Sequence, residues 1–245
     1  MPQCPNCGNQ LTGAEEHCPA CGQPTNLSPP RPDPSQPSRL QTLPLGNYIK
    51  IGWDVFKQYP GGFVAFTLVN IAIHLVLESI PFLGWAASFA ISSPLIMGNF
   101  IVSAKLLQKQ TPVFRDFFTG FYFFLPLLLL SLVATIFISI GLVLLIIPGI
   151  YLIVAYLFAS CLVVDRRLDF WPAMELSRRT VHPLWFGFLA FTLLLTVINL
   201  AGTLCLFVGL LVTIPLSFGA LAAAYADLFG FQSDYSQEVP RLENS

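Results

Sequence analysis

Three long stretches of the chain are almost free of charged residues, and they give the first prediction of the fold. They cover residues 58–104, 117–164 and 180–226, and Glu78 is the one formally charged side chain inside them. Each stretch has about 47 residues, which as one α-helix would extend about 70 Å, more than twice the hydrocarbon thickness of a bilayer. Each is therefore predicted to form a helical hairpin, so that the chain crosses the membrane about six times.

Proline and glycine residues inside these stretches predict where each hairpin reverses and where its helices bend. The predicted reversals are residues 81–84 (Pro-Phe-Leu-Gly), Pro148-Gly149, and a less sharply marked segment from Gly202 to Gly209. Three further prolines lie inside the predicted spans and are expected to kink them: Pro94, Pro126 and Pro215.

Short amphipathic helices are predicted just before the hairpins. In residues 47–58 the polar side chains share one face, and an apolar face that includes Trp53 lies opposite, which is typical of a helix at the membrane interface. Thr111 and Pro112 are predicted to be the N-cap and the first residue of a second such helix. Asp169 is predicted to cap a third, which carries further charged residues.

Two of the three hairpins share short motifs, which indicates an internal repeat. Residues 58–63 resemble residues 181–186, because each has a ring side chain followed by proline and, three residues later, phenylalanine. Farther along, the pattern Pro-Leu-x-x-Gly at residues 94–98 matches the same pattern at residues 215–219. The middle hairpin fits less well, and chance likeness between apolar segments is the alternative explanation.

The basic residues predict the orientation in the membrane. Every Lys and Arg precedes the first hairpin, lies between two hairpins or follows the last one, and the three predicted reversals contain none. Because basic residues concentrate in cytoplasmic loops, both termini are expected to lie in the cytoplasm.

The composition agrees with a membrane protein and argues against other classes. Hydrophobic residues make up 55% and charged residues 10% of the chain, and the mean hydropathy is +0.69, whereas soluble domains usually carry about 25% charged residues. A net charge of −1 gives no basic excess for binding phosphates, so no nucleic-acid partner is expected. The first residues lack the basic and apolar regions of a secretory signal peptide, so the first apolar stretch is expected to stay in the protein.

Two copies of a Cys-Pro-x-Cys-Gly motif predict a metal site near the start of the chain. The four cysteines are Cys4, Cys7, Cys18 and Cys21. Two thiolates separated by two residues can bind one ion from a tight turn, and four thiolates make a tetrahedral site suited to Zn²⁺. A rubredoxin-like iron site is disfavoured by the short segment between the motifs, and disulfides are disfavoured by a reducing cytoplasm. His17 is a further candidate ligand, but it is more simply explained as an exposed neighbour of a complete four-cysteine set.

Residues 1–24 resemble the short zinc ribbons at the N-termini of many bacterial proteins, and both cysteine motifs match in full. The segment between the motifs is long enough for one β-hairpin, and the resemblance implies folding on metal binding and contact with another protein. Residues 25–46 follow as a proline-rich linker. Such linkers favour extended conformers of about 3 Å per residue, so this one would act as a spacer, with a proline-motif ligand as the alternative.

Part of the membrane region resembles a known family. The resemblance rests on residues 145–152 (Leu-Ile-Ile-Pro-Gly-Ile-Tyr-Leu), 162–165 (Leu-Val-Val-Asp) and 173–177 (Ala-Met-Glu-Leu-Ser), and it extends over about residues 46–230. The family is a bacterial membrane domain found in YciC-like proteins and attached to some glycerophosphodiester phosphodiesterases. The resemblance implies a six-helix domain in the bacterial cytoplasmic membrane. Nothing in the chain corresponds to the phosphodiesterase's catalytic barrel, so that activity is not carried over.

One span carries a polar face that is a candidate site. Asn70, His74 and Glu78 are spaced four residues apart and so share one side of a helix. Ionisable groups at membrane depth are candidates for a proton path or a lipid-headgroup contact. The alternative is that Asn70 and His74 form hydrogen bonds between helices, while Glu78 reaches the outer interface.

These patterns predict an all-α integral membrane protein with a small β-hairpin zinc ribbon at its N-terminus. Its predicted parts are the ribbon at 1–24, the linker at 25–46, the membrane domain at 47–230 and a polar tail at 231–245. The sequence has no paired carboxylate site, nucleophile elbow or phosphate-binding loop, so we expect no enzyme. We expect an adaptor or assembly protein with Zn²⁺ as its cofactor, which recruits a cytoplasmic protein partner. The alternative is a transporter or lipid-handling protein that uses the polar face of the first span.

Overall fold

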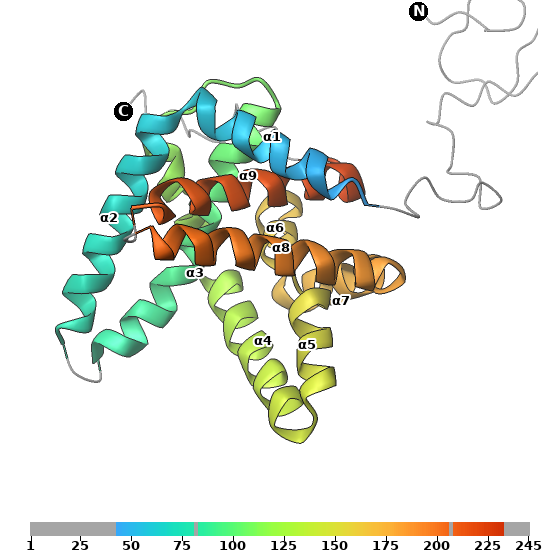
Figure 1. Ribbon diagram of the computed structural model, residues 1–245. Coiled ribbons are helices and arrows are strands. Elements are labelled where there is room, and N and C mark those ends of the chain that lie inside the picture. The colour runs from blue at the N-terminus through green and yellow to red at the C-terminus, as the bar shows by residue number, and fades with distance from the viewer. Residues whose placement is uncertain (1–42, 81–82, 206–207, 233–245) are drawn as a thin grey trace, which may run out of the picture. The chain divides into compact units, whose positions relative to one another are not determined.

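The computed structural model describes residues 43–80, 83–205 and 208–232 (Figure 1). The chain divides into two units, residues 1–41 and 42–245, and the description that follows concerns the second. The predicted zinc ligands, nearly all of the predicted linker and residues 233–245 of the predicted tail lie outside the described residues.

The described residues are helical. In chain order the elements are α1 (Leu45–Gln58), α2 (Pro60–Glu78), α3 (Leu83–Leu107), η1 (Phe114–Phe123), α4 (Phe124–Leu144), α5 (Ile146–Ala155), α6 (Ala159–Arg166), α7 (Phe170–Val181), η2 (His182–Leu184), α8 (Trp185–Leu204) and α9 (Leu210–Phe229), where η marks a 3₁₀ helix. Six helical segments are long and apolar enough to cross a membrane. This confirms the prediction of a multi-pass membrane protein and of three hairpins: α2 with α3, α4 with α5 and α6, and α8 with α9.

The two helices of each hairpin differ in burial. In the most apolar part of the second spans α3, α5 with α6, and α9, the share of buried residues is 50%, 44% and 50%. In the segments that contain the first spans α2, α4 and α8, that share is 22%, 17% and 11%. The first spans expose large apolar side chains such as Leu75, Leu125 and Leu200. Exposed apolar surface on this scale suits contact with lipid. The second spans therefore form the core, and the first spans surround it.

Two of the three predicted reversals agree with the structure. At the first, α2 ends at Glu78 and α3 begins at Leu83, and a Cβ on Gly84 would lie 1.8 Å from the Leu77 carbonyl oxygen. At the third, a Cβ on Gly209 would lie 2.5 Å from the carbonyl oxygen of Gly202. In both turns the backbones approach so closely that only glycine fits without a shift.

The predicted reversal at Pro148-Gly149 is wrong in its position. The chain turns at Leu145, which has extended dihedral angles between α4 and α5. Pro148 lies in the first turn of α5, where the backbone N–H groups have no partner within the helix and proline is tolerated. Gly149 instead packs against Gly141 across the hairpin.

The prolines inside the spans have different positions in their helices. Pro94 lies inside α3 and Pro215 inside α9, as predicted. Pro126 was predicted to kink a span, but it is the third residue of α4, in the turn that follows η1. It therefore marks the start of a helix, for the same reason as Pro148.

The fourth span contains a break that was not predicted. Helix α5 ends at Ala155 and α6 begins at Ala159. The hydroxyl of Ser177, from α7, donates a hydrogen bond to the carbonyl oxygen of Ala155 (2.7 Å) and accepts one from the backbone N–H of Phe158 (3.3 Å). A buried side chain thus replaces helical hydrogen bonds that the break removes.

All three predicted amphipathic segments are helical, but the packing of the first and the start of the second differ from the prediction. Helix α1 buries Tyr48, Gly52, Val55 and Phe56 against the protein and leaves Trp53 43% exposed, so its apolar face packs on other helices. On its polar side the hydrogen bond from Lys57 lowers the pKa of Asp54.

Thr111 and Pro112 do not begin the second amphipathic helix. That helix, η1, begins at Phe114, and Asp116 accepts a hydrogen bond from the backbone N–H of Val113 (2.8 Å) in a capping arrangement. Asp169 is the N-cap of α7 as predicted, although its side chain makes no capping hydrogen bond.

Each hairpin and the amphipathic helix before it form what we call a hairpin unit. The first has α1 to α3, the second η1 to α6, and the third α7 to α9. The three hairpin units join in a ring. The amphipathic helix of each unit packs on the second span of the unit before it: η1 on α3, α7 on α6, and α1 on α9. Because α1 begins the first unit and α9 ends the third, the α1–α9 contact closes the ring. Figure 1 shows α1 lying along α9.

The repeated Pro-Leu-x-x-Gly motifs lie at equivalent places in this ring. A Cβ on Gly98 of α3 would lie 1.9 Å from the Phe117 carbonyl oxygen of η1, and a Cβ on Gly219 of α9 would lie 2.9 Å from the Cα of Gly52 in α1. Each glycine thus lets the amphipathic helix of the next unit approach a second span.

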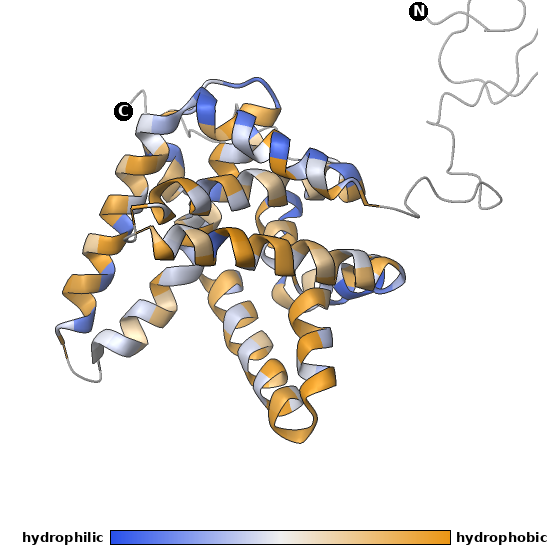
Figure 2. Cartoon of the chain, in the orientation of Figure 1, coloured by the Kyte–Doolittle hydropathy of each residue, from blue (hydrophilic) through white to orange (hydrophobic). Residues whose placement is uncertain are grey.

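Aromatic side chains fill the centre, where α3, α9 and the break before α6 meet. The ring of Tyr225 makes edge-to-face contact with Phe100 at 5.4 Å, and Phe158 makes the same contact with Phe188 at 5.3 Å. Figure 2 shows hydrophilic segments on α1, on α2, on α7 and in the connection after α3, whereas most of the α4–α5 hairpin is hydrophobic.

Candidate functional site

The polar face predicted on the first span lies on α2. Asn70 and His74 are half-buried, and they continue the side of the helix on which Phe63 and Thr67 are buried. Glu78, the last residue of α2, is exposed. Within the described part of the chain, none of these three side chains forms a hydrogen bond or an ion pair.

The predicted zinc ligands Cys4, Cys7, Cys18 and Cys21 lie outside the described residues. In residues 43–80, 83–205 and 208–232, no three His, Cys, Asp or Glu side chains gather in a way that could hold a metal ion. The two cysteines of the membrane unit are free thiols: Cys161 is buried and Cys205 is exposed.

Buried polar contacts join one unit of the ring to the next. Lys105 of α3 forms an ion pair of 2.9 Å with Asp116 of η1, and both side chains are about a tenth exposed or less. Tyr48 of α1 donates a hydrogen bond to Asp227 of α9 at 2.6 Å. Burial, together with this hydrogen bond, raises the pKa of Tyr48. Each contact lies between an amphipathic helix and the second span on which it packs.

Asp165, at the end of α6, is the centre of a third polar contact. The hydroxyl of Tyr225 in α9 donates a hydrogen bond to its carboxylate at 2.8 Å, and the backbone N–H of Gln232 donates another at 3.1 Å. The neighbouring Arg166 donates to the carbonyl oxygen of Phe229 at 2.8 Å and lies over its ring at 5.6 Å. These contacts tie the end of α9 to α6.

The sequence did not predict these partners. Asp165 was visible as the first charge after a long apolar stretch, but its partner Tyr225 is 60 residues away in the chain. Lys105 and Asp116 are close in sequence. Lys105 lies near the end of one helix and Asp116 near the start of the next, so the sequence alone could have suggested this pair.

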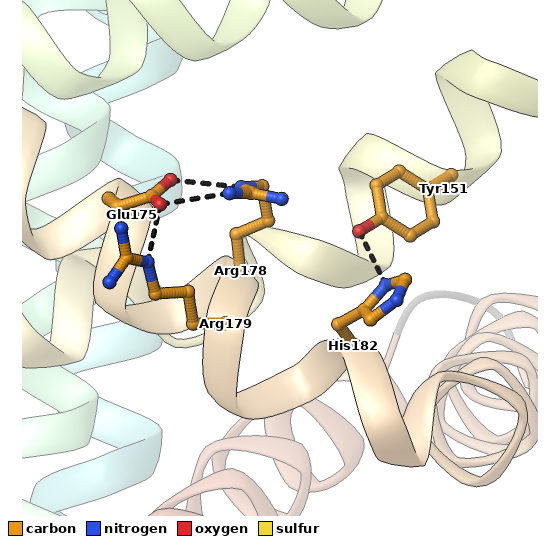
Figure 3. Close-up of polar contacts among 5 residues, drawn as sticks. All are labelled: Tyr151, Glu175, Arg178, Arg179 and His182. Atoms are coloured by element: carbon orange, nitrogen blue, oxygen red, sulfur yellow. Dashed lines mark hydrogen bonds and ion pairs between the residues drawn. The ribbon is translucent and has the colours of Figure 1, made fainter.

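A further polar cluster joins α5, α7 and η2 (Figure 3). Glu175 accepts hydrogen bonds from Arg178 at 2.8 and 2.9 Å and from Arg179 at 2.6 Å, all within one side of α7. Tyr151 of α5 shares a hydrogen bond of 2.9 Å with Nδ1 of His182. The bond between Tyr151 and His182 links α5 to η2, which directly follows α7, whereas the contacts of Glu175 lie within α7.

Polar pairs also lie between the spans. The amide of Asn199 in α8 donates to the hydroxyl of Ser217 in α9 at 2.8 Å, and Ser93 of α3 is hydrogen-bonded to Ser131 of α4. Among the described residues, no hydrogen bond joins a serine or cysteine side chain to a histidine. The two polar pairs named here each join one span to another.

No protein-family model, curated protein or solved structure matches this chain. The resemblance to the YciC-like membrane domain and to bacterial zinc ribbons therefore stays a prediction from the motifs.

Proposed function

We propose that this protein is a membrane-anchored adaptor that recruits a cytoplasmic protein through a zinc ribbon formed by Cys4, Cys7, Cys18 and Cys21. The proposal is supported by the division of the chain into two parts. The four cysteines lie in residues 1–41, and the membrane hairpins lie in residues 42–245. In the second part the polar contacts among the described residues bond helix to helix, which suits an anchor.

The proposed orientation places both termini in the cytoplasm of a bacterial cell. The basic residues of the described part of the chain support it, because they lie in α1, in α7 and η1, and at the ends of α3 and α6, while the three reversals have none in the sequence. A cytoplasmic ribbon would keep its thiolates reduced and available for Zn²⁺.

The direct test is affinity capture with cross-linking from native membranes, comparing the wild type with Cys4→Ser/Cys7→Ser at matched expression. A matched control is Cys205→Ser, which removes an exposed cysteine of the membrane unit. The proposal predicts about one Zn²⁺ per wild-type chain, and soluble partners that are lost with the ribbon variant and kept with the control. An unchanged set of captured proteins would exclude the adaptor role.

A second candidate function is transport or lipid handling at the α2 face. It is favoured by the lack of hydrogen bonds to Asn70, His74 and Glu78 within the described part of the chain, since polar side chains at membrane depth usually face a partner, water or a substrate. His74→Ala/Glu78→Ala would then abolish a flux or lipid phenotype at normal expression. Ser79→Ala, at the exposed end of the same helix, is the control. A normal phenotype in the double variant would contradict this second function.

A further inference from the structure

A cavity with a basic lining lies between the end of α3 and the start of η1. Its volume is about 620 Å³. It is lined by Lys105, Lys109, Gln110, Thr111, Val113, Arg115 and Asp116. The neighbouring turn joins the first hairpin unit to the second.

The charges of the lining do not cancel. Asp116 is neutralised by its buried ion pair with Lys105 at 2.9 Å, and its other oxygen accepts the backbone N–H of Val113. Lys109 and Arg115 are exposed, and among the described residues neither forms an ion pair or a hydrogen bond through its side chain. The cavity thus carries two cationic side chains whose charge no described carboxylate balances.

The backbone at Lys109 is strained in a way that glycine would relieve. Helix α3 ends in a Schellman turn, with hydrogen bonds from Lys109 N–H to Leu106 and from Gln110 N–H to Lys105, and Lys109 has φ 59°. After the other two second spans, the residue with positive φ is Gly230 (65°) at the end of α9 and Arg167 (52°) at the end of α6. A positive φ is therefore shared by these helix ends, and what distinguishes Lys109 is that it lines the cavity.

Apolar side chains next to the cavity indicate the depth of this region in the membrane. Val113 is 63% and Phe114 is 37% exposed, and they are the two residues before Arg115 in the chain. Exposed apolar side chains next to cations are typical of the interface, where the apolar groups reach the acyl chains and the cations lie among the headgroups.

We propose that this cavity binds a phosphate-bearing anion, with the Lys109 ammonium and the Arg115 guanidinium as its charged contacts. The hydroxyl of Thr111 lines the same cavity and supplies a further hydrogen-bonding group. Two sources offer this chemistry: the headgroup of an anionic phospholipid, and free phosphate from the aqueous side. The site is independent of the zinc ribbon and of the adaptor role.

The test uses the full chain purified in detergent. Thermal unfolding is followed while dioctanoyl phosphatidylglycerol, dioctanoyl phosphatidylcholine or inorganic phosphate is added, and the dependence on concentration gives an apparent Kd. The variants are Lys109→Gly and Arg115→Gln. Lys109→Gly is expected to fold at least as well as the wild type, because glycine adopts the positive φ without strain. The control is Lys50→Gln, which removes an exposed basic residue of α1 that does not line the cavity.

The wild type is expected to show a saturable rise in unfolding temperature, and each cavity variant is expected to bind about tenfold more weakly. Lys50→Gln should match the wild type. A rise with phosphatidylglycerol alone identifies a lipid headgroup as the source, and a rise that inorganic phosphate reproduces identifies free phosphate. The proposal is overturned if neither anion gives a saturable rise, or if both cavity variants bind as the control does.

Discussion

Glycines at the helix contacts decide how closely the units of the ring can pack. Gly98 meets the backbone of η1, and Gly52 meets the backbone of α9, where an added Cβ would lie 2.5 Å from the Leu216 carbonyl oxygen. Small residues have this role in membrane proteins because lipid gives no hydrophobic force between helices, and close packing must hold them together.

Gly98→Ala is therefore expected to destabilise the protein, although alanine is the better helix former. Its methyl group would lie 1.9 Å from a backbone oxygen that no side-chain motion can move away, at an expected loss of about 1–3 kcal/mol. Unfolding of the purified protein in detergent measures this loss. Gly61→Ala is the control, since nothing lies within 4 Å of its added Cβ; equal stability of the two variants would contradict the account.

Tyr225→Phe tests the buried contact at Asp165. Loss of the hydroxyl removes a hydrogen bond of 2.8 Å from a carboxylate that is 2% exposed, and the expected cost is about 1–3 kcal/mol. The same unfolding measurement on Tyr122→Phe is the control, because Tyr122 is 66% exposed. A difference near zero between the two variants would show that the contact adds nothing to stability.

At the scale of residues the sequence predicted little of this packing. The match of residues 94–98 with residues 215–219 was visible, and both glycines proved to be helix contacts. Gly52 has no such signal, and the partners of Asp165 and Tyr48 are far away in the chain. Such contacts depend on the tertiary arrangement, which short-range patterns do not contain.

At the scale of elements the apolar stretches predicted the spans well, because the need for about 20 apolar residues per crossing is a strong constraint. The errors concern prolines. Pro148 and Pro126 were interpreted as a turn and a kink, whereas both lie in the first turn of a helix, where proline costs no hydrogen bond. The break between α5 and α6 contains neither proline nor glycine, so no residue pattern indicates it.

Ser177→Ala tests how that break is held. Without the hydroxyl, the backbone groups of Ala155 and Phe158 lose their side-chain partner in an apolar environment, which is expected to cost about 1–3 kcal/mol. Hydrogen exchange should then speed up at residues 155–158 before other parts of the core. Ser79→Ala is the control, since Ser79 makes an exposed hydrogen bond within its own helix end. Unchanged exchange at the break would contradict this role.

At the scale of the whole molecule the central feature is the ring of three hairpins, with buried second spans and exposed first spans. The polar contacts at Lys105, Asp165 and Asp227 lie where one unit meets the next. The sequence predicted the number of hairpins, and its weak repeat indicated related units, but it did not predict that α1 closes the ring on α9. Because each hairpin has two segments long and apolar enough to cross a membrane, we predict that all three reversals lie on one side of the membrane and the connections between the hairpins on the other.

Cysteine labelling in intact cells tests that arrangement most directly. Single cysteines are placed in a chain whose six native cysteines are replaced, and a membrane-impermeant maleimide is applied before and after permeabilisation. The reversals are represented by Ile80→Cys, Leu145→Cys and Val208→Cys, and the connections by Thr111→Cys and Asp169→Cys, all at exposed positions. The account predicts that the three reversal positions react in intact cells and that the two connection positions react only after permeabilisation. Labelling of a reversal and a connection from the same side would contradict the three-hairpin arrangement.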